Sequence, residues 1–140
     1  MIAQFQNIGA FLLAKLGIAP QQISGSTPIN GGSIHRQGYQ SCVLAAKSGV
    51  STGGGTQGHV AKLQDSADGS TGWADLSVGG AVQSVTLDGD SECKTLNVNL
   101  AGAKEYIRVV LTPTWTGGTA PTQQADVTVV LGGADTLPAA

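Results

Sequence analysis

Apolar and polar residues alternate strictly in Lys94–Leu100, and apolar residues recur at every second position in Lys104–Thr112 and Ala125–Leu131. Because successive side chains of a strand point to opposite faces of its sheet, this pattern predicts strands with one face on a core. The apolar positions of these strands, with one from an earlier strand, give the expected core: Leu63, Leu96, Val98, Leu100, Ile107, Val109, Leu111, Val127, Val129 and Leu131.

Weaker versions of the same pattern precede these segments. They predict five more strands: Ser33–Arg36, Gln37–Ala46, Gly58–Gln64, Trp73–Val78 and Ala81–Leu87. The breaks carry dipeptides typical of turns, such as Asp-Gly and Gly-Gly. Short antiparallel strands at this spacing indicate a sandwich or barrel, and the jelly roll is the eight-stranded form. We therefore predict an all-β, jelly-roll-like antiparallel β-sandwich of about eight strands.

The first nineteen residues follow a different pattern. Phe5, Ile8, Leu12 and Leu16 recur at helical spacing, and Pro20 prevents continuation, so an amphipathic helix is expected. The stretch that follows is rich in Gly, Ser, Pro and Asn, which is typical of a linker. The predicted organisation is an N-terminal apolar arm and linker over residues 1–32 and a β-sandwich domain over residues 33–140.

The arm carries the side chains that we expect to bind a partner. Two placements remain open: the arm packs on its own sandwich, or it reaches a neighbouring subunit or a larger assembly. The candidate partner-binding residues are Phe5, Ile8, Phe11, Leu12 and Leu16.

Charged residues make up only 11% of the chain, against roughly 25% in an average soluble domain. Interface cores are depleted in charge, so this composition favours a surface that is covered by partners. The net charge is −2 and no basic stripe exists, which argues against nucleic-acid binding. The apolar N-terminus has neither the flanks of a signal peptide nor the length of a membrane span. Cys42 and Cys93 fit no redox or zinc motif; a disulfide between them remains open, and two buried free thiols are expected.

Two glycine motifs match catalytic or cofactor signatures by letter only. Gly53–Gly58 matches GxGxxG and Gly49–Gly53 matches GxSxG, with His59 six residues further on. Both motifs require a helix directly after the turn, whereas a strand pattern follows here. We expect a long flexible hairpin loop over Ser48–Gly58, no cofactor and no enzyme activity.

Three carboxylates lie close together around a predicted turn. Asp65, Asp68 and Asp75 offer oxygen atoms to a cation such as calcium, but the EF-hand spacing and its terminal Glu are absent. We expect a tight turn at Asp68 and no bound metal. Two aromatic residues, Trp73 and Trp115, would be needed by a carbohydrate-binding sandwich, and we expect both to pack at the ends of the sandwich.

Several short segments recur together in a familiar order. They are KLQDSADGS at 62–70, Trp73, KEYIRV at 104–109, VVLGGA at 129–134 and Leu137-Pro138. In this order they resemble the small jelly-roll decoration, or cement, proteins that coat the heads of tailed bacteriophages. The resemblance covers about residues 37–140, and the N-terminal arm departs from the compact family pattern.

This resemblance implies a structural virion protein. Cement proteins bind the outer surface of the capsid after assembly in the host cytoplasm, and they bridge neighbouring major capsid proteins. The implied partners are the major capsid protein and other copies of the chain, with a dimer favoured over a trimer, and no membrane. Two alternatives remain: another virion module, such as a head fibre or tail part, and a carbohydrate-binding β-sandwich.

Overall fold

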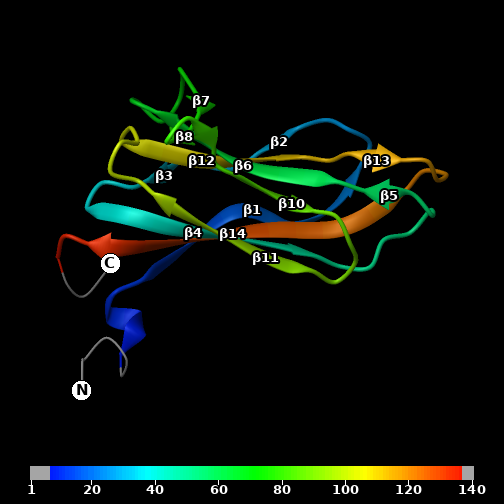
Figure 1. The fold of residues 1–140 in the computed structure, drawn as a ribbon, viewed down its shortest axis with the longest axis horizontal. Coiled ribbons are helices and arrows are strands. Elements are labelled where there is room, and N and C mark those ends of the chain that lie inside the picture. The colour runs from blue at the N-terminus through cyan, green and yellow to red at the C-terminus, as the bar shows by residue number, and fades with distance from the viewer. Residues whose placement is uncertain (1–6, 137–140) are drawn as a thin grey trace.

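The computed structural model describes residues 7–136 and shows two main antiparallel sheets packed face to face (Figure 1), with two further two-stranded sheets, β13-β5 and β8-β9. Sheet A has the strand order β1-β14-β4-β11 and sheet B the order β10-β6-β12-β2, with β3 beside β12 and β7 beside β6. The long strands are β1 (Leu13–Ser24), β4 (Tyr39–Ser48), β6 (His59–Ser66), β10 (Ser84–Leu87), β11 (Cys93–Asn99), β12 (Tyr106–Thr112) and β14 (Thr122–Ala134). The two-residue strands are β2 (Ile29–Asn30), β3 (Ile34–His35), β5 (Thr56–Gln57), β7 (Ala74–Asp75), β8 (Ser77–Val78), β9 (Ala81–Val82) and β13 (Trp115–Thr116).

The connections cross repeatedly from one sheet to the other. We count β2 and β3 as one interrupted strand. The chain then runs from β1 in sheet A to β2 and β3 in sheet B, back to β4 in sheet A, and through β6 and β10 in sheet B to β11 in sheet A. The last strand, β14, lies between β1 and β4. This is jelly-roll connectivity, and it confirms the all-β sandwich. The strand count exceeds eight because several edge segments form separate two-residue strands.

Alternation along the strands builds the core as predicted. Nine of the ten expected core residues are buried, and only Leu96 on the edge strand β11 is partly exposed. Leu44 on β4 of sheet A and Val109 on β12 of sheet B both have no exposed surface. The remaining fully buried large side chains include Ile18, Ile23, Leu87 and the polar pair His59 and Gln123.

The N-terminal segment forms a strand where an amphipathic helix was expected. Leu13–Ser24 pairs with β14, while the described helix is a single 3₁₀ turn at Ile8–Ala10. Burial of Ile18 and Ile23 and the free edge of β14 outweigh the helical spacing of the apolar residues. Strands β1 and β2 therefore extend the sandwich into the stretch that the sequence pattern assigns to arm and linker. Within the described residues, no helix is long and apolar enough to cross a membrane.

A close contact between two glycines joins β1 to the other sheet. The N–H of Gly31, next to β2, donates to the Val109 carbonyl at 2.7 Å. A Cβ at Gly31 would lie 2.0 Å from the carbonyl oxygen of Gly17, so no larger residue fits. Two bulges in β1, on either side of Ile18, accommodate this approach.

The two cysteines are free thiols, as expected, but only Cys42 is buried. Burial raises the pKa of the Cys42 thiol to about 12. Cys93 is exposed, contrary to the prediction, because it begins the edge strand β11 and faces away from the core.

Candidate interaction surface

The outer face of sheet A is formed by the side chains that alternate with the core residues. Residues directly opposite one another in an antiparallel sheet project to the same side, so the register assigns this face. One row across the sheet is Ala14, Val130, Val43 and Asn97. The next rows are Leu16, Thr128, Ala45 and Thr95, then Asp126, Lys47 and Cys93. We call these eleven residues the bare face.

The bare face carries mostly small side chains and is nearly uncharged. Its only charges within the described residues are Lys47 and Asp126, which neutralise each other at 3.0 Å. Leu16 is 62% exposed, the side chain that leaves most apolar surface on this face. A hollow of about 550 Å³ lies over β4 and β11, beside Val43 and Asn97. Such a surface is suited to burial against a partner, because few groups there need water.

The segment before β1 continues the bare face. Leu12 lies over Gly132: a Cβ added at Gly132 would lie 3.2 Å from a methyl carbon of Leu12. Ser41, which pairs with Gly132, lies on the same side of the sheet. In Figure 1 the 3₁₀ turn stands clear of the two layers, on the side of sheet A. The N-terminal segment and the bare face therefore point in the same direction.

The outer face of sheet B has a different character. Lys62 pairs with Asp75 at 2.9 Å, and the Arg108 guanidinium lies 4.5 Å from the centre of the Trp73 ring. Gln64 accepts from Arg108 and donates to Asp75. Strand β7 therefore packs along β6 and satisfies the charges of this face, whereas no described segment packs in the same way on the bare face.

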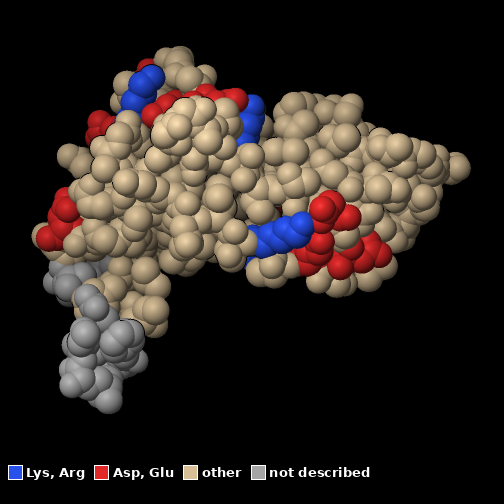
Figure 2. All heavy atoms as spheres, viewed as in Figure 1, with Lys and Arg blue, Asp and Glu red and all other residues tan. Residues whose placement is uncertain are grey.

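Figure 2 shows the charged atoms in separate groups, with long uncharged stretches between them. One group of acidic atoms belongs to the turn between β10 and β11, which carries Asp88, Asp90 and Glu92. Lys94 contacts Asp88 and lies 3.6 Å from Glu92. These contacts lower the pKa of the Asp88 carboxyl and raise that of Lys94.

The predicted partner-binding residues lie in or near this surface where they are described. Ile8, Leu12 and Leu16 are exposed, at 64%, 36% and 62%, and Phe11 is half-buried. Phe5 lies outside the described residues. Of the two placements open from the sequence, packing on the chain's own sandwich is seen for Ile18, whereas Ile8 and Leu16 are exposed. Their role in binding a partner stays a prediction.

The residues of the GxSxG motif do not form a nucleophilic site. The Ser51 N–H donates to Asp90 at 3.0 Å, and the Ser51 side chain and backbone hold the pKa of Asp90 below its usual range. The His59 ring is buried elsewhere, with both nitrogens engaged: Nδ1 accepts from the Thr114 N–H at 3.0 Å, so Nε2 carries the proton and donates to Gln123 at 3.0 Å. No ring nitrogen remains to accept a proton from Ser51.

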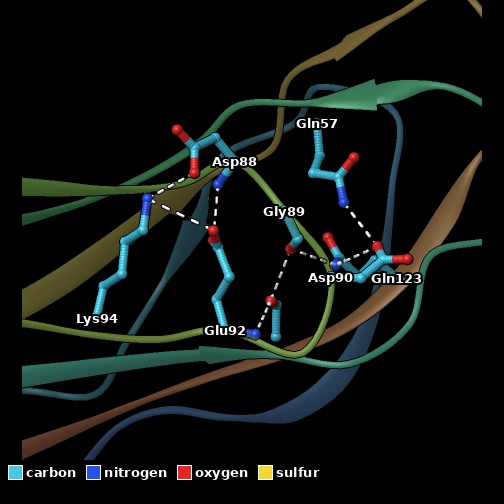
Figure 3. A network of polar contacts seen from close by, with 8 residues as sticks. Gln57, Asp88, Gly89, Asp90, Glu92, Lys94 and Gln123 are labelled. Atoms are coloured by element: carbon cyan, nitrogen blue, oxygen red, sulfur yellow. Dashed lines mark hydrogen bonds and ion pairs between the residues drawn. The ribbon is translucent and has the colours of Figure 1, made fainter.

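Gln123 also belongs to a network that joins the loops at one end of the sandwich (Figure 3). Gln123 donates to the carbonyls of Gly49 and Gly89, at 2.8 and 3.1 Å. Gln57 donates to Asp90 at 2.8 Å. The loop over residues 48–58, expected to be flexible, is therefore tied down, and its strand β5 pairs with β13. Glutamine at 123 and histidine at 59 occupy inward positions of an alternating pattern, which is the sequence signal for this buried network.

The state of His59 gives the stability a pH dependence. Burial lowers the pKa of the His59 imidazole below its ordinary value of 6.5, although the bond with Gln123 opposes this. The unfolded state therefore binds more protons as the pH falls, so stability is fully present above pH 6.5 and decreases toward the folded pKa. We expect denaturant melts to show lower stability at about pH 5 than at about pH 7.5.

The matched variant for this prediction is His59→Gln, which removes the titrating group. Its stability is expected to be lower throughout by about 1–3 kcal/mol, because buried partners lose hydrogen bonds, and to change little between the same two pH values. An equal pH dependence in both proteins would show that another group is responsible.

The three carboxylates around the 66–71 turn do not converge. Asp68 accepts from the N–H groups of Ser70 and Thr71, at 2.9 and 2.8 Å, which lower its pKa. Asp65 accepts from the Lys104 N–H, and Asp75 pairs with Lys62. Within the described part of the chain, no group of three or more His, Cys, Asp or Glu residues is placed to hold a metal ion. Asp68 closes the turn by accepting from backbone groups, as expected.

The two tryptophans are partly buried. Trp73 lies under Arg108, and the Trp115 ring meets the edge of His59 with centroids 4.6 Å apart. A hollow of about 620 Å³ beside Trp115 is lined otherwise by Ser, Thr, Gly, Ala and Pro residues. Its lining contains no carboxylate, amide or basic side chain of the kind that would orient the hydroxyl groups of a sugar.

Comparisons with known proteins extend this description. No protein-family model matches the chain, and no curated protein matches it. A chain in the structure of infectious bursal disease virus, Gx strain, has a similar fold, with a TM-score of 0.50 and 12% sequence identity over 91% of this chain and 34% of that chain. This chain thus spans about a third of the length of the viral chain. At this identity the likeness is one of fold.

Proposed function

We propose that the protein is a structural component of a virion and, more narrowly, a decoration protein of a phage head. In this role it binds the outer surface of the capsid and bridges neighbouring major capsid proteins. The order of short motifs in the sequence and the fold shared with a chain of a virus particle both support a virion role. The decoration role is supported by the surface of the molecule.

The proposed decoration role is supported mainly by the properties of the bare face. A sheet face with one neutralised ion pair, small side chains and an exposed Leu16 has little need of water. The N-terminal segment projects from the same side and carries the exposed Ile8 and Leu12 (Figure 1). We assign the bare face to the contact with the capsid and the N-terminal segment to the contact with an adjacent capsid subunit.

The structure offers a direct test of this assignment. Leu16→Asp places a charge within the proposed contact, on the edge strand β1, at a side chain that is already 62% exposed, so the fold is expected to persist. Losing the burial of one leucine costs about 1.5–3 kcal/mol, which weakens binding at least tenfold, and the buried charge adds to this. The measurement is co-sedimentation of the variant with capsid shells that lack the protein.

The matched control is Thr86→Asp, which adds the same charge to an exposed position of β10 on the other sheet. It is expected to bind shells as the unmodified protein does. If both variants bind equally well, the bare face is not the capsid contact. If Thr86→Asp alone weakens binding, the outer face of sheet B is the contact.

A further inference from the structure

Strand β11 is an open sheet edge without the usual protection. It ends sheet A, its register with β4 is unbroken from Cys93 to Asn99, and it contains no proline. The opposite edge strand, β1, contains Pro20 and two bulges, which are features that discourage pairing with another strand. Within residues 7–136, no strand pairs with the outer side of β11.

The direction of the free backbone groups of β11 follows from two hydrogen bonds. The Leu100 N–H donates to Gln40 and the Ser48 N–H donates to the Glu92 carbonyl, both at 2.9 Å. Backbone groups alternate in direction along an antiparallel strand, so the even-numbered residues bond to β4. The odd-numbered residues point their N–H and C=O groups outward: Cys93, Thr95, Asn97 and Asn99.

The core is also incomplete along this edge. Leu96 points inward, yet it is only partly buried, and so is Val85 on the neighbouring edge strand β10. Of the ten predicted core residues, Leu96 is the one that residues 7–136 leave partly exposed. A strand added to β11 would extend sheet A and cover it.

We propose that a second copy of this chain pairs with β11 through its own β11, antiparallel, on a twofold axis at Leu96. In this register Thr95 pairs with Asn97 of the second copy and Cys93 with Asn99, so that every outward backbone group of the strand is used. The two Leu96 side chains then meet at the axis and cover each other. This proposal rests on the proposed function: bridging of neighbouring capsid proteins implies a homo-oligomer, and the pairing of two β11 strands provides one.

The charges of the strand are compatible with this pairing. Lys94 lies opposite the apolar Val98 of the second copy, so no like charges face one another across the joint. The acidic turn over residues 88–92 lies at one end of β11, and the two copies of this turn are placed at opposite ends of the joint. Each turn then adjoins the partner's loop after β11, which carries Lys104, an exposed residue with no ion pair among the described residues.

The same register has a consequence for binding. Directly opposite residues of an antiparallel pair project to the same side, so Thr95 and Asn97 of both copies lie on one face of the extended sheet. The twofold axis therefore runs perpendicular to the sheet. The dimer presents two bare faces side by side in one direction, which is a surface able to contact two capsid subunits at once.

Sedimentation of the full chain tests the proposal. The unmodified protein is expected at twice the 14.0 kDa chain mass, and Thr95→Pro at the mass of one chain. Proline at 95 removes an outward N–H and leaves the bonds to β4 intact, so circular dichroism should stay unchanged. Thr86→Pro removes an outward N–H from β10 instead and should leave the dimer intact. A monomeric unmodified protein, or a Thr95→Pro dimer, overturns the proposal.

A disulfide tests the register without relying on a disruptive variant. In a Cys93→Ser background, Leu96→Cys places two thiols opposite each other in a non-hydrogen-bonded pair, where the Cα atoms lie about 4.5 Å apart and a bridge can form. Mild oxidation should give a covalent dimer, whereas Thr95→Cys in the same background should not, since Thr95 faces Asn97. Equal cross-linking of both variants, or of neither, contradicts the register. These assays contain no shells, so a dimer that fails to bind shells rejects the proposed function alone.

Discussion

Val109→Asp is expected to unfold the domain. Val109 lies on β12 with no exposed surface, between the two sheets and next to the contact of Gly17 with Gly31. An unpaired carboxylate at this position costs several kcal/mol, a large share of the roughly 5–15 kcal/mol that stabilises a domain of this size. Far-ultraviolet circular dichroism and a thermal melt check the result: the strand signal and the cooperative transition should both be lost.

Thr86→Asp again supplies the control, because it adds the same side chain to an exposed position of a strand. Its melting temperature should stay close to that of the unmodified protein. A cooperative melt for Val109→Asp at nearly the normal temperature would mean that the two sheets do not pack as described.

Deletion of residues 1–20 is expected to remove most of the thermal stability. It takes away the first eight residues of β1, including Ile18, and exposes the edge of β14 along Leu131–Val127. The burial of Ile18 alone is worth about 1.5–3 kcal/mol, and each lost ladder bond adds about 0.5–1.5 kcal/mol. Calorimetry on the isolated protein measures the loss.

Deletion of residues 1–11 is the matched comparison, because it ends before β1. This shorter deletion should melt nearly as the full chain does, and it should bind capsid shells less well because Ile8 and Phe11 are gone. If the longer deletion also melts normally, then β1 contributes nothing to the sandwich and the N-terminal segment is an arm throughout.

The sequence predicts the body of the fold well because its strands carry their own signal. In segments such as Lys94–Leu100 an apolar period of two indicates a strand and nothing else. All eight expected strands are present in the structure, and two of them are each divided into two shorter strands. Strands β2 and β5 are not predicted from the sequence, because a strand of two residues is too short to show a period. They form only where a neighbouring strand offers free backbone groups.

The N-terminal segment shows why spacing can mislead. Ile8, Leu12 and Leu16 recur as on a helix, but they do not share one face: Leu12 covers Gly132, while Ile8 and Leu16 are exposed. The residue of β1 that enters the core is Ile18, which is outside this spacing. The deciding factor is the unpaired edge of β14, more than a hundred residues away in the chain. Local pattern holds no information about a partner at that distance.

The candidate surface is partly visible in the sequence. Outward positions such as Thr95, Asn97 and Thr128 can be identified from alternation, and the low charge content indicates that some face is uncharged. Which strands share that face depends on the placement of β14 between β1 and β4. The bare face therefore emerges only once the register joins residues from both ends of the chain.

The decoration role is tested by binding of the unmodified protein to capsid shells that lack it, measured by co-sedimentation and imaged by electron cryomicroscopy. We expect saturable binding at a fixed ratio to the major capsid protein, with density at symmetry-related positions on the outer surface and the bare face against the shell. Absence of binding, or density confined to the tail or the shell interior, would contradict this role.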